Sequence, residues 1–180
     1  MATPTALPSS FTAGDVLTAA NMNLLRGAFR ILQAVSTTKT DTFSLSSATF
    51  TDVTGFSAAI TPTSSTSKVL VFVTMNVCAN WNQGSLHARL IRDSTAIAVG
   101  DAAGTRTQAS NVVAGGNNFT GQTVVISYLD SPATTSSTTY KVQIRGNTGN
   151  TTVVNRQLDD TDDPQQPRTV STITVFEVSA

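Results

Sequence analysis

The densest group of side chains able to do chemistry is a loop with four carboxylates within five residues: Asp159, Asp160, Asp162 and Asp163. Clustered carboxylate oxygens in a loop can bind Ca²⁺. The spacing lacks the glycine and the distal glutamate of an EF-hand loop, so a solvated acidic loop is the favoured interpretation. If three subunits bring these loops together, their repulsion needs either a cation or Arg156 and Arg168 as countercharges. We predict no cofactor and no assigned metal, and these four aspartates are the single candidate cation site.

Nucleophilic catalysis needs a nucleophile beside a base that activates it. His87 is the only histidine and lies in the run LHARLIR, where the alternation predicts that it points away from the core together with Arg89. Cys78 is the only cysteine, which excludes an intrachain disulfide, and it ends an apolar run as a small buried side chain would. No nucleophile-elbow or phosphate-loop motif occurs. We therefore predict no enzymatic activity and assign no catalytic residue.

Trp81 is the only tryptophan and lies in the polar run NWNQG. An aromatic side chain in a polar turn can stack on a sugar or fill a pocket of a partner. It can equally cap the end of its own β domain. Trp81 is therefore a candidate surface-contact residue.

Composition limits the partners. Charged residues make up 12% of the chain, and 11 basic residues balance 11 acidic ones. No basic field would attract nucleic acid, and no apolar run approaches the 18 residues of a membrane span, so we predict neither nucleic-acid nor membrane binding. Threonine and serine take the place of charged residues, which favours β-strands because threonine is β-branched.

The first 36 residues are predicted to form an arm and a short α-helix. Thr18 is a good N-cap for a helix from about Ala19 to Ala34. Apolar residues then recur at spacings of 3 and 4, with an asparagine in the same series. This stripe predicts either a self-associating heptad seam or an anchor packed on the β domain or on a neighbouring protein. The residues assigned to oligomerisation or anchoring are Leu17, Asn21, Leu24, Ala28, Ile31 and Val35.

Residues 37–180 are predicted to form one mainly β domain, an antiparallel β-sandwich or jelly roll, because strand-like runs recur between turn signals. The runs are Asp41–Leu45, Thr49–Val53, Ser57–Thr61, Lys68–Val77, Leu86–Arg92, Thr95–Val99, Gln122–Leu129, Thr139–Arg145, Thr151–Arg156 and Val170–Val178. Residues 100–121 fit either an irregular loop or weak strands.

Two of these runs are apolar at nearly every position. Lys68–Val77 reads KVLVFVTMNV, and the last run reads VSTITVFEV. Such runs are typical of strands covered on both faces, either within the domain or in a subunit contact.

Five segments carry a resemblance to a known group of proteins. They are FTAGDVLTAANMN, TDTFSLSSATFTDVTGFSAAITPTSSTSKVLVFV, RLIRDSTAIAVGDAAGTRTQAS, ISYLDSPATTSSTTYKVQIRGN and RTVSTITVFEVSA. Together they resemble virion proteins, often described as tail-fibre-like, of bacteriophages that infect aquatic bacteria, cyanophages included. The resemblance implies a jelly-roll head module that forms trimers, and it carries no catalytic residue.

These observations predict a bacteriophage virion protein. The leading expectation is a trimeric tail or neck fibre or appendage, docked to other virion proteins by its N-terminal arm and helix, with a projecting β head. A capsid decoration protein is the second expectation. The third is a carbohydrate-binding module that attaches to a glycan of the host surface.

Overall fold

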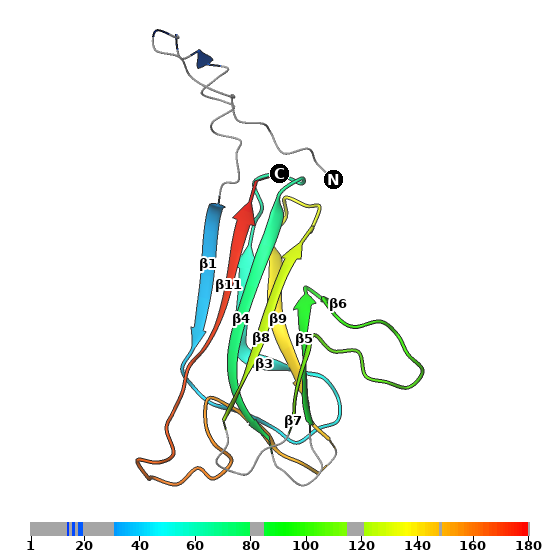
Figure 1. Cartoon of the computed structure of the whole chain (residues 1–180), viewed down its shortest axis with the longest axis vertical. Coiled ribbons are helices and arrows are strands. Elements are labelled where there is room, and N and C mark those ends of the chain that lie inside the picture. The colour runs from blue at the N-terminus through cyan, green and yellow to red at the C-terminus, as the bar shows by residue number, and fades with distance from the viewer. Residues whose placement is uncertain are drawn as a thin grey trace.

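The computed structural model describes residues 14, 16, 18, 19, 31–79, 85–114, 121–147 and 149–179. Within these residues the chain forms eleven strands (Figure 1). They are β1 (Ile31–Lys39), β2 (Phe43–Leu45), β3 (Thr51–Ile60), β4 (Lys68–Ala79), β5 (Ser85–Arg92), β6 (Thr95–Ile97), β7 (Asn111–Ala114), β8 (Gln122–Asp130), β9 (Thr138–Arg145), β10 (Thr152–Val154) and β11 (Ser171–Val178).

The strands form two sheets, and every pairing is antiparallel. In the sheet that we call sheet A, β1, β11, β4 and β8 lie side by side (Figure 1). Strands β10 and β2 continue this sheet beyond the end of β11. This is possible because β4 is long enough to pair first with β11 and then, from Val77, with β10. Sheet B has the order β3-β9-β5, with β6 and β7 both on β5. The predicted mainly β, antiparallel fold is confirmed.

The inner faces of the two sheets share one hydrophobic cluster. On β9, Tyr140, Val142 and Ile144 are fully buried, and Leu86, Ala88 and Leu90 on β5 are buried with them. This is the alternation expected for strands with one covered face. Each buried valine, leucine or isoleucine contributes roughly 1.5–3 kcal/mol relative to its exposed state, so this cluster is the main source of stability.

Strand β3 is one continuous strand where the sequence predicts two, Thr49–Val53 and Ser57–Thr61. Its pairing with β9 changes register between Asp52 and Ser57, and Gly55 within this interval has a φ of 72°. A left-handed residue in a bulge lets the strand continue on the far side. The following residue, Phe56, can then point into the core, where it is fully buried.

The predicted end of the helix is wrong. Ile31–Lys39 form strand β1, which pairs with β11 from Lys39 opposite Ser171 to Ile31 opposite Val178. Residues 31–34 therefore belong to a strand rather than to a helix, and the β region begins before Thr37. Pairing with β11 supplies the backbone hydrogen bonds that a helix would otherwise make. The rest of the predicted helix lies outside the described residues, and the division into arm and domain stays a prediction.

The heptad seam also fails at its last two positions. The pairing of β1 with β11 shifts register between Ile31 and Gln33. Ile31 lies opposite Val178 on the outer face, whereas Val35 lies opposite Val175 and packs against the core. The two side chains are therefore on opposite faces of sheet A. Leu17, Asn21, Leu24 and Ala28 lie outside the described residues.

For residues 100–121 the structure shows part of each alternative: residues 100–110 form no strand, whereas Asn111–Ala114 form β7 and pair with β5. Residues 115–120 lie outside the described residues. None of the helices in the described residues is long and apolar enough to cross a membrane.

Candidate functional surfaces

The outer face of sheet B is polar and internally paired. Lys141 donates to Asp52 at 2.6 Å, and Gln143 donates to the other oxygen of the same carboxylate at 2.6 Å. The Arg89 guanidinium lies 4.0 Å from the centre of the Phe50 ring and donates from Nε to Gln143. The charges on this face are therefore neutralised or stacked within the chain itself.

The outer face of sheet A is apolar in its middle. Phe72 is 43% exposed, Val125 55% and Leu129 54%. The register places Leu129, Leu70 and Phe176 in one row across β8, β4 and β11. The Phe72 and Phe176 rings meet edge to face, with centroids 6.2 Å apart. We call Leu70, Phe72, Val125, Leu129 and Phe176 the apolar face of sheet A.

This face bears on the expectation that Lys68–Val77 is covered on both sides. Among the described residues only its inner side, with Val69, Val71 and Val73, is buried in the core. Sheet B lies over the inner side, and no described element lies over the outer one.

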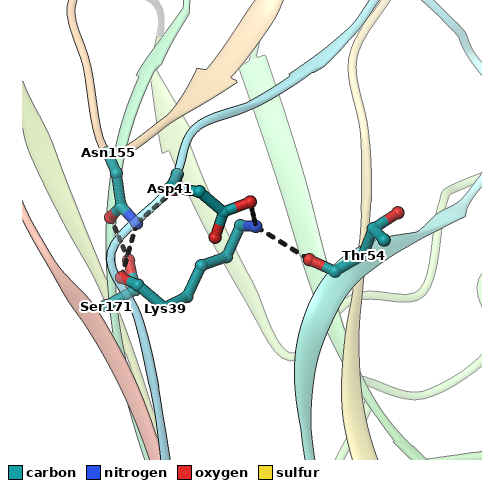
Figure 2. Close-up of polar contacts among 5 residues, drawn as sticks. All are labelled: Lys39, Asp41, Thr54, Asn155 and Ser171. Atoms are coloured by element: carbon teal, nitrogen blue, oxygen red, sulfur yellow. Dashed lines mark hydrogen bonds and ion pairs between the residues drawn. The ribbon is translucent and has the colours of Figure 1, made fainter.

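A buried lysine connects the two sheets at one end of the sandwich. Lys39 is 2% exposed, and its Nζ donates to Asp41 Oδ2 at 2.7 Å and to the Thr54 carbonyl at 2.8 Å (Figure 2). Thr54 precedes Gly55 in the β3 bulge, so the bulge turns a carbonyl toward the ammonium group. Hydrogen bonding from Lys39 lowers the pKa of Asp41 below its ordinary value. The hydrogen bond from Lys39 to the Thr54 carbonyl joins β1 of sheet A to β3 of sheet B.

Asn155 fixes the same end of the sandwich from the other side. Its Nδ2 donates to the carbonyls of Lys39 and Asp41 at 2.8 and 3.0 Å, and its Oδ1 accepts from Ser171 Oγ at 2.6 Å (Figure 2). The residue is fully buried and has a φ of 61°. Asparagine is one of the few residues that tolerate this left-handed conformation. Ser171 in turn accepts from the backbone N–H of Asn76 at 3.0 Å.

Glu177 is the only glutamate of the chain and is fully buried. Its Oε1 accepts from the Thr63 backbone N–H and hydroxyl at 2.7 Å each, and its Oε2 accepts from Gln33 Nε2 at 2.7 Å. Burial alone would raise the pKa of Glu177, but hydrogen bonds from Gln33, Ser67 and Thr63 outweigh it and lower the pKa below its ordinary value. The carboxylate holds the loop between β3 and β4 against β1 and β11.

A third buried polar group joins the sheets near the opposite edge. Arg92 of β5 donates from Nη1 to Asp130 of β8 at 2.9 and 3.0 Å, and the Tyr140 hydroxyl of β9 donates to Asp130 at 2.7 Å. Burial, and then the neighbouring Asp130 carboxylate, raise the pKa of Tyr140 above its ordinary value. The phenol is therefore neutral at physiological pH and serves as a hydrogen-bond donor.

Replacing Tyr140 with phenylalanine should lower the free energy of unfolding by about 1–2 kcal/mol, because a buried carboxylate loses a donor while the ring remains in the core. Urea unfolding at pH 7 measures this. Tyr128→Phe is the control, since the structure shows no hydrogen bond from the Tyr128 hydroxyl to any described residue and it should change stability by less than about 0.5 kcal/mol. Equal effects of the two substitutions would contradict a role for the bond to Asp130.

The acidic loop does not gather its carboxylates. Asp160 pairs with Arg168 at 2.7 Å and lies 3.7 Å from Arg156, so the flanking arginines act as its countercharges. Asp163 Oδ1 accepts from the Gln165 backbone N–H within a turn. Among the described residues, no three histidine, cysteine or acidic side chains lie close enough together to hold a metal ion. The arrangement of Asp159, Asp160, Asp162 and Asp163 thus offers no assembled cation site.

His87 points to the outer face of sheet B, as its place in the alternation predicts. Its Nε2 lies 2.7 Å from Ser85 Oγ, but Nδ1 has no hydrogen-bond partner among the described residues. A serine–histidine pair needs a group that orients the imidazole through this second nitrogen. Burial and the nearby Arg145 lower the pKa of His87, so the ring is neutral at pH 7.

Cys78 is 1% exposed, as predicted, and burial raises the pKa of its thiol. A thiol with a raised pKa is a poor nucleophile at neutral pH, because the thiolate is the reactive form. Trp81 lies outside the described residues, so its proposed contact role stays a prediction.

The fold is a two-sheet antiparallel β architecture, and comparison with known proteins finds partial likeness to virus capsid proteins. One is a D431N mutant of the VP2 protein of infectious bursal disease virus, 15% identical, with a TM-score of 0.41 over 81% of this chain and 36% of that one. The structure of the Gx strain of the same virus matches at 18% identity and a TM-score of 0.43, over 82% of this chain and 39% of that one. The chain thus spans less than two-fifths of these neighbours.

No known family model matches the sequence, and no curated protein is similar to it in sequence.

Proposed function

We propose that this chain is a virion structural protein of a bacteriophage, a trimeric tail or neck appendage whose β domain projects from the particle. The apolar face of sheet A is the observation that carries the proposal. Large exposed apolar patches on soluble proteins mark interaction sites, and a β-domain with one polar and one apolar outer face fits a subunit of an assembly. The resemblance of the five sequence segments supports the assignment to a phage particle.

The arrangement of the polar groups is consistent with a structural role. Lys39, Asn155, Glu177 and Asp130 are buried and hydrogen-bonded to groups that join strands or loops. Buried polar groups of this kind hold neighbouring elements in one arrangement. The N-terminal segment, with Leu17, Asn21, Leu24 and Ala28, is proposed to dock the subunit to other virion proteins.

Light scattering coupled to size-exclusion chromatography tests the trimer. At micromolar concentration we expect a particle of three times the 18.8 kDa chain mass. A stable monomer would contradict the proposal.

Immunogold labelling of intact particles then separates an appendage from a capsid decoration, since label at the tail or neck supports the former and label over the shell supports the latter. Binding to a host glycan array would instead favour a carbohydrate-binding module.

A further inference from the structure

We infer that the apolar face of sheet A is the surface through which copies of this chain meet, with the equivalent faces of sister chains turned toward a common axis. The inference rests on the proposed function and adds the location of the contact, because the sequence leaves it open between the N-terminal helix and the two strands that are apolar on both sides. The occupants of the face are the same faces of the two sister chains of the trimer.

The size of the face suits this role. Between the levels of Leu129 and Val125, four strands at about 4.8 Å spacing and five residues at about 3.4 Å each give about 330 Å² in the plane of the sheet. The accessible area of a face covered with side chains exceeds its plane area. Stable interfaces bury about 800 Å² on each partner, so this face supplies about two-fifths of that amount in plane area alone. It lies within the range of about 300–600 Å² of the largest apolar patch on a typical monomer, a patch that is often a functional surface.

The chemistry of the face favours contact with itself. The rows across β8, β4, β11 and β1 hold only leucine, phenylalanine, valine, alanine, serine and threonine between the level of Leu129 and that of Val125. The nearest cation, Lys68, lies at the rim and donates to Ser131 Oγ at 2.7 Å. Bringing identical faces together therefore buries no charge and creates no like-charge repulsion.

The other broad face is unsuited to this contact. On sheet B, Arg89, Lys141 and Asp52 are already committed to partners within the chain. Burying that face against a copy of itself would desolvate these charges without supplying new partners. The contrast between the two faces assigns self-association to sheet A.

A pair of matched substitutions tests the assignment. Val125 on the apolar face is 55% exposed, and Val112 on the outer face of sheet B is 53% exposed. In the full chain, Val125→Glu should weaken self-association at least about a hundredfold, because it brings carboxylates of several copies together in an apolar contact. Val112→Glu adds the same charge and should leave the mass at its wild-type value. Sedimentation velocity over a concentration series measures both.

A second variant on the same face guards against a local folding defect. Leu129→Glu, at a side chain 54% exposed, should dissociate the assembly as Val125→Glu does. Far-UV circular dichroism and the melting temperature of the resulting monomer should match those expected for a folded domain.

The outcomes separate the two proposals. If the wild-type chain is an oligomer and both variants on the face remain oligomers, the inference is overturned while the proposed function stands with its contacts elsewhere. If Val112→Glu dissociates the chain as strongly as Val125→Glu, the inference is overturned as well, since added charge alone would explain the effect. A monomeric wild-type chain overturns both.

Discussion

Replacing Glu177 with glutamine should lower the free energy of unfolding at pH 7 by about 3 kcal/mol. The carboxylate accepts on both oxygens, from Thr63 on one and from Gln33 on the other. An amide has one oxygen and one NH₂ group. In either orientation, the NH₂ group of the glutamine would face a group that is itself a donor, either the Thr63 N–H and hydroxyl or the Gln33 amide. A buried donor without an acceptor loses its hydration with no compensation, and here the loop between β3 and β4 would lose its attachment to β11.

The same substitution should remove part of the acid sensitivity of the fold. Hydrogen bonds lower the pKa of Glu177 in the folded chain below its ordinary value of 4.5. Its contribution is therefore fully present above about pH 4.5 and is lost as the pH falls through the lower pKa of the folded state, because protons then bind the unfolded chain more readily. The difference in stability between wild type and Glu177→Gln should shrink as the pH is lowered.

Urea unfolding at pH 7 and at pH 3.5 measures both effects. Asp101→Asn is the matched control: it removes the same charge at an exposed position and should change stability by less than about 0.5 kcal/mol. A Glu177→Gln variant as stable as Asp101→Asn at pH 7, or a stability difference from wild type that does not narrow in acid, would show that the hydrogen bonds of the carboxylate contribute nothing.

Alternation alone predicts most of the β fold. Tyr140, Val142 and Ile144 are buried as their period of two predicts, and β4 and β11 lie where their apolar runs place them. The first four residues of β1, 31–34, are predicted to end a helix, because their apolar residues continue the spacing of 3 and 4 from the preceding segment. The strand is decided by the pairing of Lys39 with Ser171, 132 residues away, and of Ile31 with Val178, 147 residues away. Short-range periodicity does not contain that information.

The sequence analysis also does not predict which polar side chains are buried. Glu177 does occupy an inward position in the alternation Ser171, Ile173, Val175, Glu177, which is the one signal that could have found it. Nothing near Lys39 indicates burial, because its acceptors come from a turn and from a bulge in another sheet. For the acidic loop, the clustering of four aspartates suggests a cation site and the flanking arginines offer an alternative countercharge; in the folded loop Arg168 pairs with Asp160.

Replacing Asn155 with alanine should lower the free energy of unfolding by about 4 kcal/mol. The side chain satisfies the buried carbonyl of Lys39, the carbonyl of Asp41 and the hydroxyl of Ser171, and losing these bonds costs about 3 kcal/mol. The backbone adds about 1 kcal/mol to this loss, because the φ of 61° at this position is less favourable for alanine than for asparagine. The end of the sandwich where β1, β10 and β11 meet should loosen first.

Asn155→Gly separates the two terms, since glycine loses the same hydrogen bonds but adopts a left-handed conformation without strain. It should therefore be about 1 kcal/mol more stable than Asn155→Ala, although its own flexibility in the unfolded chain offsets part of that gain.

Ser171→Ala removes the third hydrogen bond and also the acceptor of the Asn76 backbone N–H. The double variant Asn155→Gly with Ser171→Ala should then cost less than the sum of the single variants, as expected for side chains that share a bond. Strict additivity in urea unfolding would mean that Asn155 and Ser171 act independently, and the description of one connected polar group around Lys39 would be wrong.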